Sequence, residues 1–149
     1  MSLFVHNWEQ ITDDPWILSS VGSGFKLEFT AQPFQSSRPA QIFMSKQMSE
    51  ACDLEVESLL SKDAIRRVHH KPGEFLSSLF VVPKKGGSFR PIINLKDLNR
   101  FIAYTRFKRE NLSAVRHLLR KDDWLVKLDL QDAYLTLPFH EDYRQFLRF

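Results

Sequence analysis

The chain has 149 residues, of which 43% are hydrophobic and 26% charged, and its formal net charge is +3. This composition is typical of globular domains that can bury a core, and it excludes a disordered chain. The mild positive surplus permits a nucleic-acid partner without requiring one.

Cysteine usage and the N-terminus predict an intracellular protein. Cys52 is the single cysteine, which excludes an internal disulfide framework and fits a reducing compartment. Residues 1–4 lack the basic and apolar regions of a secretory signal, and no apolar run approaches the ~18 residues that span a bilayer. We therefore expect a cytoplasmic or nuclear protein that is neither secreted nor a membrane protein.

The first 44 residues predict a helix, a strand and a connector. Asp14 suits a helix N-cap and Pro15 the first turn, so a helix is expected to run up to the break at residues 22–24. Residues 25–29 alternate apolar and polar side chains as a strand does. Residues 32–39 are rich in Pro and Ser and are typical of a loop.

The middle of the chain predicts a helix followed by a β-hairpin. Apolar residues recur at helical spacing over residues 45–60, and Cys52 on that stripe is expected in the core. Residues 64–68 predict a short strand and residues 71–73 a turn. Residues 75–82 and 89–95 predict two strands joined by a tight basic turn, with Pro91 limiting the second to an edge or a bulge.

The last third predicts short helices and two more strands. Residues 96–101 predict a short helical turn, and Leu112, Val115, Leu118 and Leu119 mark an amphipathic helix. The remaining expected elements are a strand over residues 124–130, one helical turn over residues 132–135 and a strand over residues 144–149.

The predicted strand over residues 124–130 carries a carboxylate near its end. Alternation puts Lys127 and Asp129 on one face and the apolar residues on the other. An ionised Asp129 needs a cation, hydrogen-bond donors or water, and Asp132 follows where a helix could begin. Two interpretations stay open on spacing alone: a metal and phosphate site, or a surface ion pair with a helix N-cap.

The predicted hairpin turn is basic and rich in glycine. Lys84, Lys85 and Arg90 surround Gly86 and Gly87. Such a hairpin suits a polyphosphate or a nucleic-acid backbone. It is equally an exposed turn whose lysines protect a sheet edge. His69 and His70 have no neighbours at metal-ligand spacing, and we expect both to be exposed.

Two segments together resemble retroelement reverse transcriptases. Residues 80–99 (FVVPKKGGSFRPIINLKDLN) are similar to the fingers hairpin of that family, and residues 128–134 (LDLQDAY) to its first palm motif. The resemblance is clear over residues 64–149, and the ordered pair is specific. Trp8, residues 14–16 and residues 24–29 resemble the region that precedes the polymerase in retrotransposons of the DIRS type.

The resemblance implies a role for each residue of the palm motif. Asp129 becomes the first catalytic carboxylate and a ligand of two magnesium (or manganese) ions, with the backbone carbonyl of Leu130 as a further ligand. Asp132 and Ala133 bind the incoming deoxynucleoside triphosphate through backbone N–H groups. Tyr134 lies under the sugar and excludes a 2′-hydroxyl.

The resemblance also implies a role for the fingers cations. Arg90, with Lys84 or Lys85, closes over the phosphates of the nucleotide. The chemistry fits, because an Arg fork binds phosphate bidentately and fixed cations neutralise the transferring group. The two lysines compete for one matching position, and the choice between them stays open.

The sequence departs from the family after the first palm motif. The family continues with a glycine-containing motif, a hairpin bearing aromatic-x-Asp-Asp and a thumb, but no Asp-Asp pair lies after Asp129. Asn94 and Lys96 stand where some members have an acidic residue and an arginine. We therefore expect a fragment that is inactive by itself and binds magnesium only with the complete palm.

The expected fold class is α+β: reverse-transcriptase-like fingers with a β-hairpin and helices, plus an incomplete antiparallel palm sheet. The predicted units are an extension (1–44), the fingers (45–123) and a truncated palm (124–149). The expected function is a fragment of an RNA-directed DNA polymerase, whose partners are an RNA or DNA template–primer and deoxynucleotides. Two alternatives stay open: a non-catalytic nucleic-acid-binding remnant of a retroelement, and a structural or interaction domain.

Overall fold

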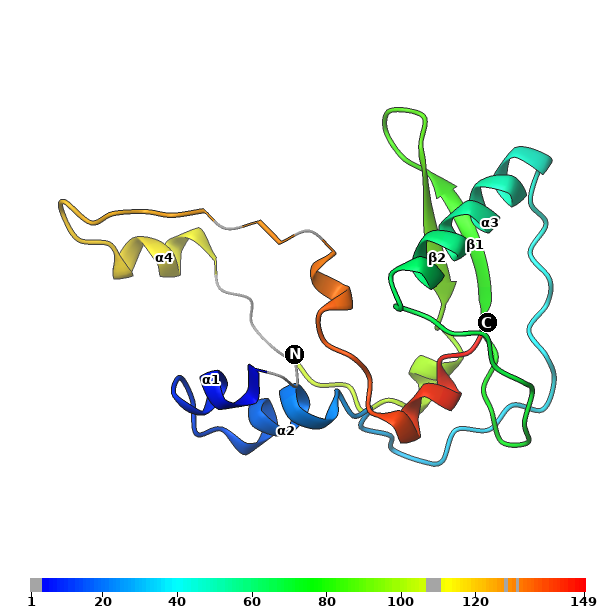
Figure 1. The fold of residues 1–149 in the computed structure, drawn as a ribbon, viewed down its shortest axis with the longest axis horizontal. Helices are drawn as coiled ribbons and strands as arrows, with labels where there is room; N and C mark the ends of the chain where they lie inside the picture. The colour runs from blue at the N-terminus through cyan, green and yellow to red at the C-terminus, as the bar shows by residue number, and fades with distance from the viewer. Residues whose placement is uncertain (1–3, 107–110, 128, 131) are drawn as a thin grey trace.

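The computed structural model describes residues 4–106, 111–127, 129–130 and 132–149, with the side chain of Leu112 excepted. Helices and one two-stranded antiparallel sheet make up this part of the chain, which is compatible with the expected α+β class (Figure 1). The elements in chain order are α1 (Val5–Glu9), α2 (Pro15–Ser23), α3 (Lys46–Ser61), β1 (Ser78–Pro83), β2 (Phe89–Asn94), the 3-10 helix η2 (Leu98–Phe101), α4 (Leu112–Leu118), and the 3-10 helices η3 (Ala133–Leu135) and η4 (Glu141–Phe146).

Side-chain caps start the two longest helices where the sequence predicts. The carboxylate of Asp14 accepts a hydrogen bond from the backbone N–H of Trp16 at 2.8 Å, with Pro15 as the first residue of α2. The hydroxyl of Ser45 accepts from the N–H of Met48 at 3.3 Å at the start of α3. Each cap satisfies an N–H group that the helix itself leaves without a partner.

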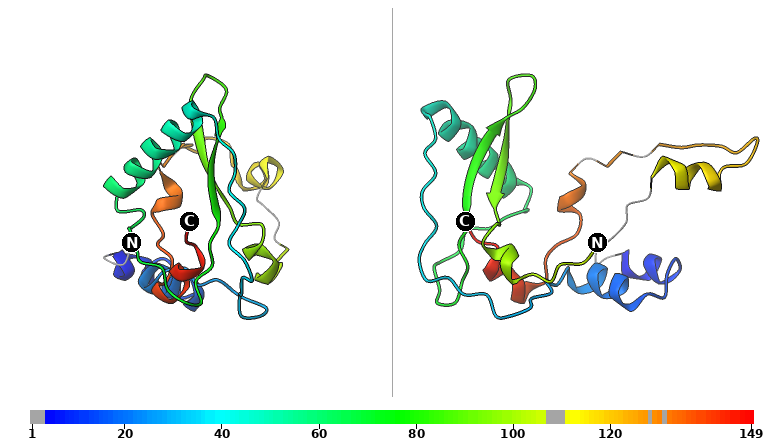
Figure 2. Two further views of the ribbon diagram at one scale, coloured as in Figure 1. Left: turned by 90° about the vertical axis from the view of Figure 1, so that its right-hand side faces the viewer. Right: turned by 180° about the vertical axis from the view of Figure 1, so that it is seen from behind.

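The hairpin β1–β2 forms with Val82 opposite Arg90 and Ser78 opposite Asn94. Its loop is closed by a hydrogen bond from the N–H of Lys84 to the carbonyl of Ser88 at 2.7 Å. Helix α3 packs along both strands (Figure 2). The sheet has two strands, so β2 is an edge and accommodates Pro91 as predicted.

The predicted strand over residues 75–82 begins later than expected, at Ser78. The preceding residues pair with the C-terminal segment: Phe75 donates its N–H to the carbonyl of Gln145 at 3.0 Å and Ser77 donates to that of Arg148 at 2.8 Å. An isolated parallel bridge joins Leu76 to Arg148. Residues 75–77, the first three of the predicted strand, therefore pair with the C-terminal segment instead of with β2.

The core gathers residues from distant parts of the chain. Phe75, Leu98 and Phe146 are buried together, and Phe29, Leu95, Phe101 and Leu147 pack against them. Val81 of β1 and Cys52 of α3 are each buried as well, so the prediction of a core cysteine is confirmed. Residues of all three predicted units (1–44, 45–123 and 124–149) meet in the core, and those boundaries stay a prediction.

The predicted strand over residues 25–29 is present only as isolated bridges. Phe25 pairs in parallel with Phe139, and Phe29 pairs antiparallel with Ile102. The residues between these bridges have no ladder partner in the described part of the chain. A ladder needs a neighbouring strand along its whole length, which the alternation within one segment cannot supply.

Three further strand predictions are wrong. Residues 64–68 follow a turn at the end of α3, where Asp63 has φ +53° and Ala64 donates its N–H to the carbonyl of Leu59 at 3.0 Å. Residues 124–127, 129 and 130 form no strand, and Leu128 lies outside the described residues. Residues 144–146 belong to η4.

Local polar contacts explain η4. The ring Nδ1 of His140 accepts from the N–H of Asp142 at 3.4 Å, and Glu141 and Asp142 occupy the first turn. Acidic side chains there suit the positive end of a helix. These contacts outweigh the alternation that predicted a strand.

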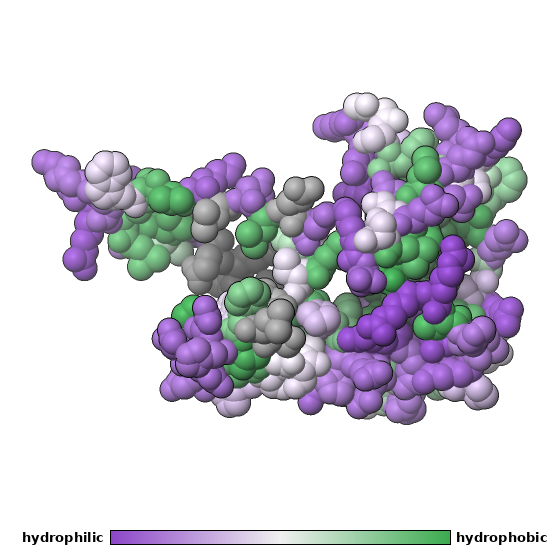
Figure 3. All heavy atoms as spheres, in the orientation of Figure 1, coloured by the Kyte–Doolittle hydropathy of each residue, from purple (hydrophilic) through white to green (hydrophobic). Residues whose placement is uncertain are grey.

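Helix α4 and the residues after it project from the rest of the fold (Figures 1 and 2). Figure 3 shows apolar side chains gathered over this projection. The most exposed large apolar side chains there are those of Trp124, at 97%, and Val126, at 82%. None of the helices in the described ranges is long and apolar enough to cross a membrane.

Candidate functional site

The basic hairpin tip is fully accessible. Lys84, Lys85 and Arg90 are exposed, and within the described residues none of their side chains forms a hydrogen bond or an ion pair. Gly86 and Gly87 have φ values of +110° and +85°, which only glycine adopts readily. The tip lies at the free end of the hairpin (Figure 1), where three unpaired cations can meet a phosphate.

The described residues of the predicted palm motif are exposed to solvent. Asp129 is exposed and Leu130 is 69% exposed. Tyr134, in η3, is 98% exposed. Gln131 and Leu128 of the same motif fall outside the described residues.

Asp132 is tied to the end of α3. Its carboxylate accepts a hydrogen bond from the ammonium of Lys62 at 2.9 Å, and both side chains are about half exposed, at 46% and 45%. The backbone of Asp132 has a φ of +52° and leads into η3. The N–H groups of Asp132 and Ala133 have no partner among the described residues, so they remain available to an anion.

The two groups of predicted residues are not joined into one site. No hydrogen bond or ion pair connects the described residues of the hairpin with those of the segment 129–134. The prediction of a single nucleotide site made from both groups is therefore untested by any contact, and it stays a prediction.

The described residues do not fit a magnesium site. No three His, Cys, Asp or Glu side chains come together within the ranges that the structure describes. Asp129 brings one carboxylate, and the nearest acidic residue in the motif, Asp132, is engaged by Lys62. One carboxylate and a carbonyl hold magnesium poorly, because that ion keeps most of its water and demands octahedral order.

Sequence reasoning missed an ionic cluster around Glu74, whose side chain is 5% exposed, whereas that of His70 is 62% exposed. Glu74 accepts hydrogen bonds from Arg148 and from the backbone N–H of Lys71, and its other oxygen contacts His70. Burial raises the pKa of Glu74, but the hydrogen bonds from His70, Lys71 and Arg148 together hold it below its ordinary value. The four-residue spacing of His70 and Glu74 was visible, whereas nothing in the sequence pointed to Arg148.

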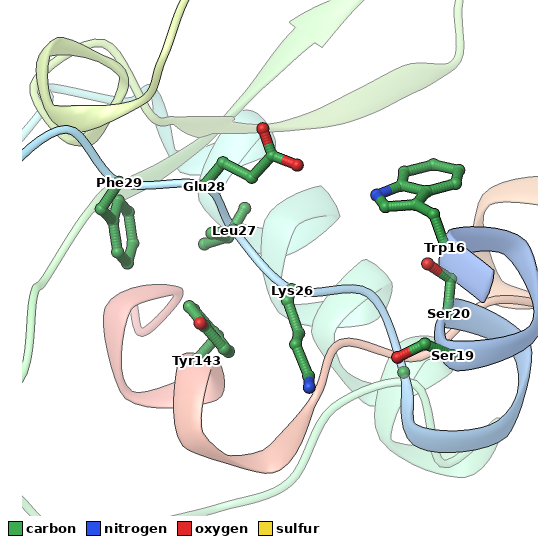
Figure 4. Close-up of a pocket in the computed structure, with 9 residues that line it drawn as sticks. Trp16, Ser19, Ser20, Lys26, Leu27, Glu28, Phe29 and Tyr143 are labelled. Atoms are coloured by element: carbon green, nitrogen blue, oxygen red, sulfur yellow. The ribbon is translucent and has the colours of Figure 1, made fainter.

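A pocket of about 490 Å³ lies between α2 and η4. Figure 4 shows its residues: the side chain of Lys26 lies between Tyr143 and Ser19, and that of Glu28 leaves the backbone in the opposite direction. Within the described residues neither Lys26 nor Glu28 takes part in an ion pair. In the sequence, residues 25–29 predict a strand and residues 24–29 belong to the upstream resemblance, and neither indicates a pocket.

The comparisons with known proteins point to retroviruses. The Gag-Pol polyprotein of bovine immunodeficiency virus (strain R29) is 30% identical over 98 residues, which cover 65% of this chain and 6% of that protein. The Pol polyprotein of caprine arthritis encephalitis virus (strain Cork) is 33% identical over 73 residues, or 48% of this chain and 6% of that protein. No protein-family model and no solved structure matches the chain.

The chain thus has weak homology to retroviral Gag-Pol and Pol polyproteins over part of its length, consistent with a retroelement-derived protein. It spans about 6% of the length of these relatives.

Proposed function

We propose that this chain is part of the RNA-directed DNA polymerase of a retroelement, comprising the fingers hairpin and the first palm motif. The observation that carries the proposal is the hairpin β1–β2. Lys84 and Lys85 in its loop and Arg90 in β2 have no ion-pair partner among the described residues, and they stand at the position that the family resemblance assigns to nucleotide binding. The homology to retroviral polyproteins supports the same origin. A retrotransposon of the DIRS type is the proposed source.

Arg90 and one of Lys84 and Lys85 bind the phosphates of the incoming deoxynucleotide or of the template–primer. Unpaired, exposed cations on a turn with two glycines can adapt to a phosphate without first breaking an ion pair. The N–H groups of Asp132 and Ala133, which have no hydrogen-bond partner within the described ranges, are suited to the triphosphate. Tyr134, being almost fully exposed, is available to contact a sugar.

Asp129 is the proposed catalytic carboxylate. Magnesium or manganese would need carboxylates additional to Asp129, because the described residues supply one at this position. An RNA or DNA template–primer is the proposed partner, in the cytoplasm or nucleus.

A second candidate is a nucleic-acid-binding remnant without catalysis. The described part of the palm motif favours it: with the carboxylate of Asp132 paired to Lys62, only Asp129 brings an unengaged carboxylate there, whereas two metals need carboxylates on both sides. Both candidates require the hairpin to bind nucleic acid, whereas a purely structural domain would not bind it.

The test is binding of a labelled RNA–DNA template–primer, followed by fluorescence anisotropy across a range of salt concentrations. Replacing Lys84, Lys85 and Arg90 with Ala should lower the salt slope by roughly one unit for each lost phosphate contact. The matched control replaces Lys46, Arg66 and Arg67, three exposed cations outside the hairpin, and should change the slope less. An equal effect of both sets would reject the hairpin as the contact.

A further inference from the structure

A second pocket, of about 280 Å³, lies between the connector that precedes α3 and the turn that precedes β1. Residues 35–38 line it from the connector, and residues 70–74 with Leu76 line it from the turn. The side chain of Gln35 joins the two segments, because it donates to the carbonyl of Leu76 at 2.9 Å and accepts from the N–H of Leu76 at 3.0 Å. Both walls of the pocket are therefore held by the residues that lead into β1.

The positive charges at this pocket are not balanced by its carboxylate. Glu74 is the acidic residue among those that line it, and its oxygens are engaged by His70, by the backbone N–H of Lys71 and by Arg148. The side chains of Arg38 and Lys71 are exposed, and neither takes part in an ion pair within the described ranges. Two cations are therefore available to a ligand.

Hydrogen-bond donors lie beside these cations on both loops. Ser36, Ser37 and Arg38 are successive exposed residues, and the backbone bends at the two serines. The N–H groups of all three have no partner in the part of the chain that the structure describes, and the two serine hydroxyls have none there either. The N–H of Gly73, across the pocket, is in the same state, and a Cβ at Gly73 would meet nothing within 4 Å. Successive N–H groups in a turn form concavities that bind anions.

We propose that this pocket binds a phosphate monoester, which is a terminal phosphate group carrying about two negative charges and three acceptor oxygens. Arg38 and Lys71 match that charge, and the guanidinium of Arg38 can bind two phosphate oxygens at once. A carboxylate has one charge and two oxygens, so it would leave more of the donors without a partner. The site is separate from the hairpin and does not depend on the proposed polymerase role.

The first measurement is isothermal titration of the full chain with inorganic phosphate at constant ionic strength. Binding should be one-to-one, and it should be weakened about tenfold or more in Arg38→Gln and in Lys71→Gln, because each loses a hydrogen bond between charged groups. The matched control is Arg66→Gln, which removes an exposed cation outside the pocket and should leave the affinity unchanged.

A second readout reports on the backbone donors themselves. In proton–nitrogen correlation spectra, phosphate should shift the amide signals of Ser36, Ser37 and Gly73, because those N–H groups acquire an acceptor. The variant with Lys84, Lys85 and Arg90 replaced by Ala should show the same shifts and the same affinity for phosphate.

Two sources can supply such a group: a small phosphorylated molecule and the 5′-terminal phosphate of a nucleic-acid strand. The hairpin variant is therefore titrated with one oligonucleotide in its 5′-phosphorylated and 5′-hydroxyl forms. Tighter binding of the phosphorylated form, lost on addition of Arg38→Gln, would support the pocket and assign it to strand ends. Equal binding of the two forms, with inorganic phosphate still bound, would support the pocket and assign it to small molecules.

Several results would overturn the proposal. These are the absence of saturable phosphate binding, an affinity unchanged in both Arg38→Gln and Lys71→Gln, and amide shifts that leave residues 36–38 and 73 unmoved. Loss of phosphate binding in the hairpin variant would place the phosphate at the hairpin instead. If phosphate binds as expected but the hairpin variant keeps the salt slope of the wild type for template–primer, the proposed function fails and this site stands.

Discussion

Arg148 and Glu74 form an ion pair that fastens the C-terminal segment to the residues before β1, across 74 positions of the sequence. Their side chains are 15% and 5% exposed. The same Nη1 of Arg148 donates to the carbonyl of His69 at 2.8 Å. Because the backbone of Arg148 also pairs with Ser77, one residue anchors this segment through both its main chain and its side chain.

The Glu74 cluster predicts a loss of stability in acid. The pKa of Glu74 is lower in the folded than in the unfolded chain, owing to its hydrogen bonds from His70, Lys71 and Arg148, which outweigh burial. Its contribution to the free energy of unfolding is therefore complete above the ordinary glutamate pKa and is lost as pH falls through the folded value. Denaturant titrations from neutral pH into acid should show a steeper loss for the wild type than for Glu74→Gln.

The control for this measurement is Glu57→Gln on the exposed face of α3, which should follow the wild-type slope. Coincident slopes for all three proteins would contradict a stabilising role for the Glu74 carboxylate.

Gly24 and Gly73 form a matched pair for a test of the fold. Both have positive φ values, +96° and +82°. A Cβ at Gly24 would lie 2.7 Å from the backbone N of His140, whereas a Cβ at Gly73 would meet nothing within 4 Å. Gly73→Ala should cost about 1–2 kcal/mol from backbone strain alone.

Gly24→Ala adds a backbone clash, so we expect a cost of about 3 kcal/mol or more. Equal unfolding free energies for the two variants would mean that residues 138–140 do not pack on Gly24. The measurement is urea unfolding followed by tryptophan fluorescence.

Local signals in the sequence were sufficient for helices α2, α3 and α4 and for the hairpin. Asp14 caps the helix that it was expected to cap, because capping depends on residues within one turn. Helix α3 begins at Lys46, one residue after the predicted start. The hairpin turn likewise depends on its own glycines and on the strands beside it. These predictions needed no knowledge of distant segments.

Strands without a local partner could not be predicted in the same way. Residues 25–29 and 124–130 both have strand-like sequences, but whether a ladder forms depends on segments far along the chain. For the candidate site, sequence reasoning found the exposed cations of the hairpin. It could not foresee that Lys62 pairs with Asp132, which lies 70 positions away.

The exposed apolar side chains after α4 predict self-association. Trp124 and Val126 are 97% and 82% exposed, and the backbone groups of residues 124–127 have no hydrogen-bond partner among the residues that the structure describes. Exposed apolar side chains beside unpaired backbone groups favour pairing with another chain. Sedimentation velocity should show association at micromolar concentrations, reduced in the variant carrying Trp124→Ser and Val126→Ser.

The control for that association is Phe43→Ser, since Phe43 is 95% exposed in the connector before α3 and lies outside the projecting segment. It should associate as the wild type does. A wild-type chain that remains monomeric throughout would contradict the prediction.

The final prediction is that this chain by itself does not extend a primer. Phosphoryl transfer with two metals requires ions about 3.5–4 Å apart, held by carboxylates on both sides. Asp129 is exposed, Asp132 is engaged by Lys62, and no three potential ligands come together in the described residues. Without a site for the two metals, catalysis should be absent rather than slightly slower, because the charge on the transferred phosphoryl group has no other preorganised partner there. The measurement is primer extension on an RNA template with magnesium or manganese and all four deoxynucleotides, using the purified chain and its Asp129→Asn variant. Extension by the wild type that Asp129→Asn abolishes would show that another carboxylate, from this chain or from a second copy, completes the site.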